Sequence, residues 1–310
     1  MTRRIRLLAA LGAGLLVLAA PPSGAAQSRT ITDDAGSVFT LGAPPRRIVS
    51  LAPNITEILF ALGLGDRIVG VTRYCDFPPE AKAKEKIGGF IDPNVEKIRA
   101  LDPDLVIAFR GNPWEALNRL KSLGVPVFIL DIGERLEAVP ETIAKIGRVT
   151  GREDEARTLV AALEEKLRMA RAAMSRTSGR PRVYLNLSGK ALMTCGRSSY
   201  LHDLIERAGG TNVAAAVPKT WSAYSREQLI RDDPDVVIIL SPSPAEFAAA
   251  RAWFVALPGL DTLRAVRSGR VRPLDENTAS RIGPRLYDAF ADLVRIIHGG
   301  DRGGSRGPGL

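Results

Sequence analysis

The chain has 310 residues, 45% of them hydrophobic and 5% aromatic, and carries a formal net charge of +9. This length is typical of two domains that together bury a sizeable core. The positive excess is spread along the chain without interleaved aromatic residues, which argues against a nucleic-acid-binding patch.

The first 26 residues have the pattern of a cleaved secretory signal. Three arginines among the first six residues precede an uncharged apolar run from Leu7 to Ala20, and small residues follow at Gly24, Ala25 and Ala26. An apolar run of about 14 residues is too short to span a membrane, so we expect cleavage rather than anchoring. Loss of these arginines leaves a mature charge of +6. The sequence therefore predicts a periplasmic protein.

Strands and helices are predicted to alternate after this signal. In chain order, the apolar runs and turn residues predict a hairpin at 31–41, a strand at 48–51, a helix at 56–62, strands at 68–71 and 105–109, a helix near 113–123 and a strand at 127–130. Such alternation indicates a mainly parallel sheet with helices on both faces.

A longer helix is predicted from Glu153 to about Met174, because apolar residues recur there at helical spacing. Acidic residues open this segment and arginines lie near its end, in agreement with the helix dipole. Its 22 residues correspond to a rod of about 33 Å. A strand at 183–187 then starts a second region with the same alternation, which continues to Ile297.

We therefore expect an α/β protein with two Rossmann-like lobes, each with a mainly parallel sheet, joined by a long rigid α-helix and enclosing a ligand cleft. The predicted divisions are a signal peptide at 1–26, an N-terminal lobe at 27–150, a linking helix at 151–179, a C-terminal lobe at 180–298 and a glycine-rich disordered tail at 299–310.

One segment occurs twice, which supports two similar lobes. Residues 96–107 and 227–238 share a glutamate, an Asp-Pro-Asp sequence and an aliphatic run at an offset of 131 positions. Each copy is predicted to form a helix, a turn and a buried strand. The paired features are the acids Glu96 and Glu227, the aromatic residues Phe90 and Trp221, and the predicted N-caps Asn94 and Ser225.

Catalytic and metal-binding patterns are weak. His202 and His298 are the only histidines, and both lie in amphipathic stretches without a paired base or metal-ligand spacing. The sequence lacks Gly-x-Gly-x-x-Gly and Gly-x-Ser-x-Gly motifs, and residues 188–190 lack the glycine spacing of a phosphate loop. We expect neither catalysis nor a cofactor nor a bound metal. For Cys75 and Cys195, free or partly buried thiols are expected, with an interlobe disulfide as the alternative.

The mature chain resembles the periplasmic binding proteins of ABC importers for cobalamin, siderophores and haem, the type whose two lobes are joined by a rigid helix. Residues 45–57, 101–107 and 221–227 carry the resemblance to this superfamily, and residues 74–81, 108–111 and 280–285 most resemble its cobalamin-binding branch. The resemblance implies a receptor, expected to be a monomer, that captures a corrinoid and delivers it to a membrane-embedded permease dimer with its ATPase.

The same resemblance implies a ligand site with groups from both lobes. Its expected members are Tyr74, Phe90, Phe109, Arg110, Met193, Trp221 and Arg281. Rigid aromatic surface suits a broad amphipathic corrin ring, and arginines suit amide or phosphate oxygens at its edge. The chain has phenylalanine at positions 90 and 109, where cobalamin receptors often carry tryptophan, and Met193 where an aromatic residue is common. These departures leave open which corrinoid is bound. A ferric siderophore or haem, with Tyr74 as axial ligand, is the alternative ligand, and an exported enzyme is a more distant alternative.

Glu96 and Glu227 each stand in the first turn of a predicted helix, where an acid contributes about 0.3–1 kcal/mol. That role does not require equivalent positions in two lobes. The resemblance implies a second role, in which one glutamate on each lobe tip docks onto arginines of a two-fold importer. A pseudo-two-fold receptor needs matched contacts of this kind.

Overall fold

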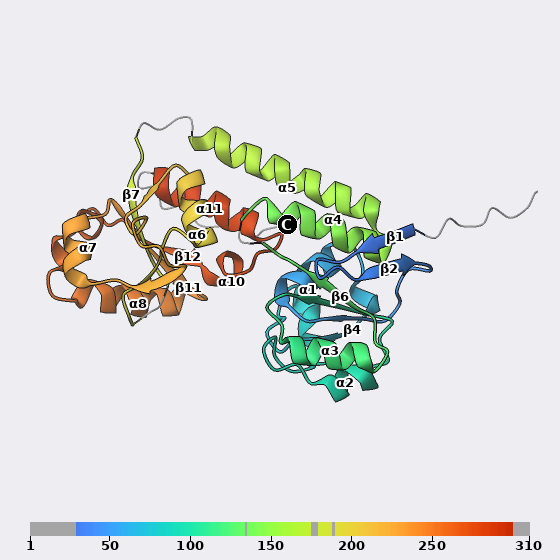
Figure 1. Ribbon diagram of the computed structural model, residues 1–310. Helices are drawn as coiled ribbons and strands as arrows, with labels where there is room; N and C mark the ends of the chain where they lie inside the picture. The colour runs from blue at the N-terminus through green and yellow to red at the C-terminus, as the bar shows by residue number, and fades with distance from the viewer. Residues whose placement is uncertain (1–28, 134, 175–178, 188–189, 300–310) are drawn as a thin grey trace, which may run out of the picture.

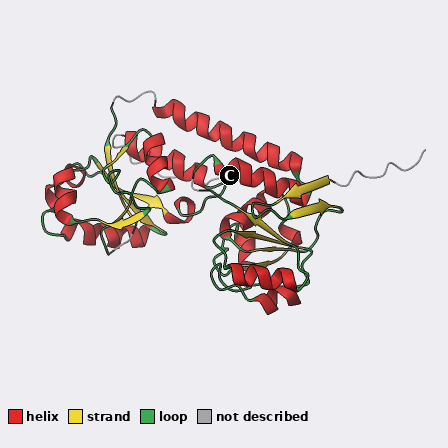
Figure 2. Cartoon of the chain, in the orientation of Figure 1, coloured by secondary structure: helices red, strands yellow, loops and turns green. Residues whose placement is uncertain are grey.

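The computed structural model describes residues 29–133, 135–174, 179–187 and 190–299, which form two lobes alongside a long helix (Figure 1). Strands lie at the centre of each lobe and helices lie outside them (Figure 2). The predicted signal peptide and all but the first residue of the predicted tail lie outside the described residues.

The N-terminal lobe contains a four-stranded parallel sheet in the order β4-β3-β5-β6. Its strands are β3 (Ile48–Ser50), β4 (Ile68–Val71), β5 (Leu105–Phe109) and β6 (Val127–Leu130), and its helices are α1 (Pro53–Ala61), α2 (Val95–Ala100), α3 (Trp114–Ser122) and α4 (Ala138–Thr150). Alternate strand residues face opposite sides, so Ile48 packs in the cluster that contains α1 and α4, while Val49 packs with α2 and α3. The strands are almost entirely apolar because helices cover both faces.

The C-terminal lobe contains a second parallel sheet in the order β12-β11-β7-β9. Its strands are β7 (Arg182–Asn186), β9 (Thr211–Asn212), β11 (Val236–Ser241) and β12 (Val271–Asp275), and its helices are α6 (Tyr200–Arg207), α7 (Arg226–Asp232), α8 (Pro244–Ala256), α9 (Arg264–Arg267), α10 (Glu276–Ala279) and α11 (Leu286–His298). Alternation again divides the core, with Val183 in the cluster of α6 and α11 and Tyr184 in the cluster of α7 and α8.

Two antiparallel ribbons and three short 3₁₀ turns complete the described fold. The ribbons are the hairpin β1 (Arg29–Thr32) with β2 (Val38–Leu41) and the pair β8 (Met193–Cys195) with β10 (Trp221–Ala223), and the turns are η1 (Gly65–Arg67), η2 (Pro79–Ala83) and η3 (Leu260–Thr262). The sequence predicted the first ribbon but not the second, whose strands are only three residues long.

Helix α5 (Glu153–Met174) has the predicted bounds and lies against both lobes (Figure 1). Its buried residues Ala156, Leu163 and Ala170 are spaced by seven positions and form one stripe in a hydrophobic cluster that includes α4 and α11. Lys166 Nζ lies 2.5 Å from Asp288 Oδ1 of α11, which adds a polar tie to the C-terminal lobe. None of the described helices has the length and apolar character needed to cross a bilayer.

The repeated Asp-Pro-Asp sequence has a structural role in both lobes. Asp102 and Asp233 adopt positive φ values of 44° and 37°, so each turns the chain just after its helix. Asp104 accepts hydrogen bonds from the backbone nitrogens of Arg46 and Arg47 at 2.7 and 3.0 Å, and Asp235 accepts one from Arg182 at 2.8 Å. The second aspartate therefore fixes the chain at the start of the first core strand of its lobe.

The predicted helix caps are confirmed. Asn94 accepts a hydrogen bond from the Lys97 nitrogen at 2.8 Å, and Ser225 accepts one from Gln228 at 3.1 Å. The repeat is thus explained largely by folding, through caps, turns and strand anchors. Its glutamates take no part in these bonds.

Both cysteines are free and buried, which confirms the first expectation and shows the alternative of an interlobe disulfide to be wrong. The hydroxyls of Thr56 and Thr72 lie 3.1 Å from the Cys75 sulfur. Burial raises the pKa of the Cys75 thiol and raises that of Cys195 to about 12. Both groups therefore stay protonated at neutral pH and act as small apolar residues.

Candidate ligand-binding site

The predicted site residues of the N-terminal lobe follow the carboxyl ends of its parallel strands. Tyr74 lies in the loop after β4, and Phe109 is the last residue of β5. In open parallel sheets, ligands bind outside this edge because the loops there diverge. The topology therefore favours this edge as the place for a ligand.

Phe90 contacts both Tyr74 and Phe109, and these three residues are called the N-lobe aromatic cluster below. The ring centroids of Tyr74 and Phe90 are 5.4 Å apart, and those of Phe90 and Phe109 are 6.4 Å apart, both with tilted rings. Tyr74 is 45% exposed, while the two phenylalanines are half-buried. The cluster is thus a supported aromatic surface rather than a set of isolated side chains.

Asn112 holds this cluster in place, and the sequence did not identify it. Its Nδ2 donates to the carbonyls of Leu51 and Phe90 at 3.1 and 2.8 Å, and its Oδ1 accepts from the Phe109 nitrogen at 2.9 Å. The side chain is buried, so these bonds are shielded from water. A single amide therefore joins the backbones that carry two of the three rings. An asparagine in a loop has no signal in the sequence that predicts such partners.

The C-terminal lobe contributes Trp221 and Tyr200, whose ring centroids are 6.2 Å apart with an edge-to-face angle of 89°. Trp221 is 42% exposed and pairs with Cys195 in the ribbon of β8 and β10, while Met193 pairs with Ala223. Met193 and Trp221 are thus diagonal neighbours on one face of the ribbon. Tyr200, which the sequence did not identify, donates from Oη to the Ala279 carbonyl at 2.8 Å.

The two aromatic groups meet at one segment, residues 279–281. Tyr200 bonds to Ala279, and the Arg281 Nη2 lies 3.4 Å from the Tyr74 carbonyl of the other lobe. Residues 279–281 therefore contact both Tyr200 of the C-terminal lobe and the Tyr74 backbone of the N-terminal lobe.

Arg281 belongs to a four-residue interlobe ion network. Its Nη1 lies 2.5 Å from Asp76 Oδ1 and 3.2 Å from Glu57 Oε1. Arg285 also binds Glu57, with Nε and Nη2 donating to the two carboxylate oxygens at 3.0 and 2.6 Å. The Glu57 side chain is only 2% exposed, and two arginines of the other lobe compensate its charge. We expected Arg281 at the edge of a ligand, and the structure shows that it also holds the lobes together.

Two further contacts extend the network. The Arg285 guanidinium carbon lies 3.9 Å from the Phe77 ring centroid, a cation–π contact. Asn54 Nδ2 donates to the Ile282 carbonyl at 3.0 Å.

The hydrogen bond from Arg281 lowers the pKa of Asp76, although partial burial opposes that shift. Asp76 is therefore ionised at neutral pH.

Arg110 is placed with the N-terminal hairpin. Its guanidinium donates to the Asp34 carbonyl and lies 3.7 Å from an Asp131 carboxylate oxygen.

Glu96 and Glu227 are exposed in the first turns of α2 and α7. In Figure 1, α2 lies on the side of its lobe remote from α5, and α7 lies at the outer end of the other lobe. Arg226 Nη2 lies 3.4 Å from Glu227 Oε1, so the second acid is partly compensated by its neighbour.

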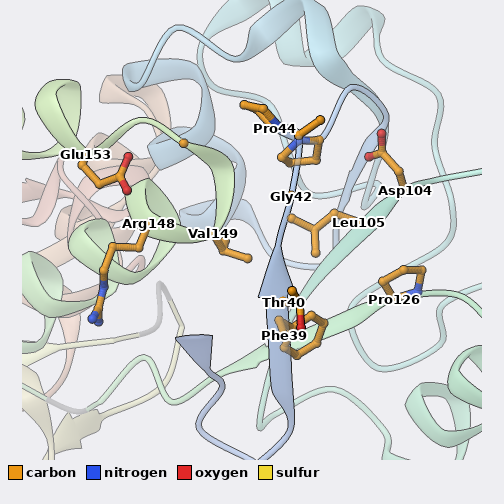
Figure 3. A pocket seen from close by; sticks show the side chains of 13 residues that line it. Phe39, Thr40, Gly42, Pro44, Asp104, Leu105, Pro126, Arg148, Val149 and Glu153 are labelled. Carbon is orange, nitrogen blue, oxygen red and sulfur yellow. The ribbon is translucent and has the colours of Figure 1, made fainter. Parts of the chain in front are cut away.

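A hollow of about 570 Å³ lies at the opposite, amino ends of the N-lobe strands. Figure 3 shows Phe39 from the hairpin, Asp104 and Pro126 at the starts of β5 and β6, and Arg148 and Glu153 from α4 and α5 around it. This joint between hairpin, sheet and linking helix is away from the edge that carries the aromatic residues, so we do not assign the ligand to it.

The histidines are held by structural partners. His202 Nδ1 lies 3.2 Å from Asn212 Nδ2, and His298 Nε2 lies 2.7 Å from the Ala208 carbonyl. Within the described ranges, no three histidine, cysteine, aspartate or glutamate side chains are grouped so that they could hold a metal ion.

Residues 48–278 match the family model for periplasmic binding proteins. The chain belongs to this family. It is 31% identical over 275 residues to the cobalamin-binding protein of Halobacterium salinarum, covering 87% of this chain and 74% of the relative. The solved haem-binding protein RhuT from Roseiflexus sp. RS-1 has 31% identity and a TM-score of 0.73, and the vitamin B12-binding protein BtuF of Vibrio cholerae has 27% and 0.69. Each of these two alignments covers 83% of this chain and 98% of the other.

These similarities confirm the predicted family and the two-lobed α/β fold. Members of the family work with ABC importers and carry their ligands as cargo rather than as cofactors. The names of the similar proteins include cobalamin, vitamin B12 and haem, so they do not distinguish a corrinoid from haem.

Proposed function

We propose that the chain is a periplasmic receptor that binds a corrinoid and delivers it to an ABC importer, without catalysing a reaction. The observation that supports this most is aromatic surface from both lobes, since residues 279–281 bond both to Tyr200 of the Tyr200–Trp221 pair and to the Tyr74 backbone of the N-lobe aromatic cluster. A broad amphipathic ring between two such surfaces loses apolar area to water at roughly 25 cal/mol per Å². The two named cobalamin relatives agree with this choice.

The proposed contacts to the ring faces are Tyr74, Phe90 and Phe109 from one lobe and Met193 and Trp221 from the other. Arg281 is the proposed polar contact at the ring edge, because its Nη2 lies beside the Tyr74 carbonyl. Arg110 is a second proposed polar contact, because its side chain is 55% exposed while Asp34 and Asp131 orient its guanidinium.

Titration of the mature protein with cyanocobalamin, haemin and a ferric catecholate, followed by heat or absorbance, tests the proposal. We expect saturable binding of cyanocobalamin at a ratio of one ligand per chain. Saturable binding of haemin or the catecholate, with none of cyanocobalamin, would make the corrinoid assignment wrong while leaving the receptor function intact.

Haem is the second candidate, and one observation favours it. Tyr74 is 45% exposed, and its phenol oxygen is a chemically suitable axial ligand for iron. An absorbance change of haemin that is lost in Tyr74→Phe would support this candidate.

We also propose that Glu96 and Glu227 dock the receptor, as a monomer, onto a two-fold permease. Replacing both by alanine should leave corrinoid affinity unchanged and strongly reduce ligand-stimulated transport in vesicles containing the importer. Glu115 and Glu246 are exposed first-turn acids of α3 and α8, one in each lobe, and their double alanine variant is the matched control. Equal transport by the two double variants would reduce Glu96 and Glu227 to helix-stabilising acids.

A further inference from the structure

The interlobe ion network has a charge balance that bears on ligand choice. Glu57 and Asp76 supply two negative charges, and Arg281 and Arg285 supply two positive charges. Three of the four side chains are nearly buried, with exposed fractions of 2% for Glu57, 15% for Arg281 and 16% for Arg285. Asp76 is the exception at 45%. The four charges sum to zero, and the exposed Asp76 carboxylate balances the second arginine charge.

Asp76 and Glu57 use the same nitrogen of Arg281. Both carboxylates bind Nη1, whereas Nη2 makes a long hydrogen bond of 3.4 Å to the Tyr74 carbonyl. Tyr74 carries the exposed ring of the N-lobe aromatic cluster. The guanidinium thus lies next to the proposed ligand surface with its charge already compensated on the Asp76 side.

We propose that Asp76 is a selectivity residue, which makes the site favour a macrocycle with a neutral amide edge over one that carries carboxylates there. This inference rests on the proposed function. An amide oxygen can accept a hydrogen bond from Arg281 while Asp76 stays in place. A ligand carboxylate would have to displace Asp76 from the guanidinium or lie close to a like charge. Discrimination by such a repulsive element is a general route to specificity.

Asp76→Asn tests this, because it keeps the size of the side chain and removes its charge. The probes are cyanocobalamin and a monocarboxylic acid derivative in which one peripheral amide has been hydrolysed. We expect wild-type protein to bind cyanocobalamin more tightly, and the variant to shift the ratio of the two dissociation constants by about tenfold toward the acid. Asp76→Glu keeps the charge and should keep most of the wild-type preference.

Asp154→Asn is the matched control, because it removes an exposed aspartate that pairs with Arg157 on α5, away from the site. It changes the net charge equally, so a general electrostatic effect would shift both variants alike. If Asp76→Asn unfolds at the temperature of the titration, the ratio of the two dissociation constants is measured with Asp76→Ser at a lower temperature. An unchanged ratio in a folded Asp76 variant, or an equal shift in the control, overturns the inference.

Haemin separates this inference from the proposed function. If the wild-type protein binds haemin and no corrinoid, the corrinoid assignment fails, and the charge of Asp76 still predicts that Asp76→Asn binds haemin about tenfold more tightly through its propionates. Unchanged haemin affinity in that case overturns the inference as well. Binding of neither macrocycle by the folded wild-type protein overturns both.

Discussion

The two lobes share a frame but differ in how they present aromatic surface. The repeat places Phe90 and Trp221 at equivalent positions, six residues before Glu96 and Glu227. Phe90 lies in a loop, in contact with two other rings of its cluster, whereas Trp221 lies in strand β10 and contacts Tyr200. Equivalent sequence positions thus give a supported three-ring surface in one lobe and a single exposed ring on a ribbon in the other.

The difference follows from what surrounds each position. In the N-terminal lobe, the Asn112 amide fixes the chain at Phe90 and Phe109. In the C-terminal lobe, backbone pairing of β8 with β10 fixes Trp221 instead. The connection between the lobes, through Glu57 and the arginines, depends instead on side chains of both.

The largest effect is expected at that connection. Glu57→Gln leaves two partly buried arginines without their shared carboxylate, which should lower the free energy of unfolding by about 3 kcal/mol. The value lies at the low end of the usual range because Arg281 keeps Asp76 as a partner. Glu165→Gln, which breaks an exposed pair with Arg168 on α5, should have a much smaller effect, because solvent screens that pair. Urea unfolding of both variants checks this, and equal losses would contradict it.

The next effect concerns ligand binding. Trp221→Ala should weaken cyanocobalamin binding by about 2 kcal/mol, or roughly thirtyfold, with little change in stability because the ring is exposed. Tyr74→Ala should cost less affinity, since Phe90 and Phe109 still offer aromatic surface on that side. Calorimetric titration of both variants with cyanocobalamin compares how much the aromatic surface of each lobe contributes to affinity. A larger loss of affinity for Tyr74→Ala than for Trp221→Ala would show that Phe90 and Phe109 do not compensate for the missing Tyr74 ring.

A smaller effect compares two side chains that support the aromatic rings, Asn112 in the N-terminal lobe and Tyr200 in the C-terminal lobe. Asn112→Ala removes the side chain that bonds to the backbone groups of Leu51, Phe90 and Phe109, and should destabilise the protein by about 1–3 kcal/mol. Tyr200→Phe removes one hydrogen bond to Ala279 and should cost about 0.5–1.5 kcal/mol. Thermal unfolding of the two variants measures the difference. Equal losses would mean that water replaces the bonds of Asn112.

Local patterns in the sequence predicted the frame well, and contacts between distant residues were not predictable. The bounds of α5 follow from apolar spacing within that segment, and the caps Asn94 and Ser225 act within three residues. Glu57 and Arg285 are 228 positions apart, so nothing local indicates their pairing. The resemblance indicated which rings to expect, but the supporting groups Asn112 and Tyr200 depend on the folded geometry.

The smallest effect compares two acids that follow carboxyl ends of strands, Asp76 after β4 and Glu276 after β12. The Arg281 hydrogen bond lowers the pKa of Asp76, so this carboxylate stabilises the fold above its unfolded pKa of about 3.9, and the contribution is lost as pH falls through the lower folded value. Burial, and then the charges of Glu246 and Asp275, raise the pKa of Glu276. Its ionisation therefore destabilises the fold, and the penalty disappears as pH falls below the unfolded pKa of about 4.3.

Amide substitutions at these two positions should accordingly have opposite signs. At pH 7, Asp76→Asn should lower the free energy of unfolding by less than about 1 kcal/mol, since the pair is partly screened by solvent. Glu276→Gln should raise it slightly, and both differences from the wild-type protein should shrink in acid. Urea unfolding of the three proteins at pH 7 and near pH 3 provides the comparison. Differences of the same sign at pH 7 would show that ionisation of Asp76 and ionisation of Glu276 have the same effect on stability, which contradicts the prediction.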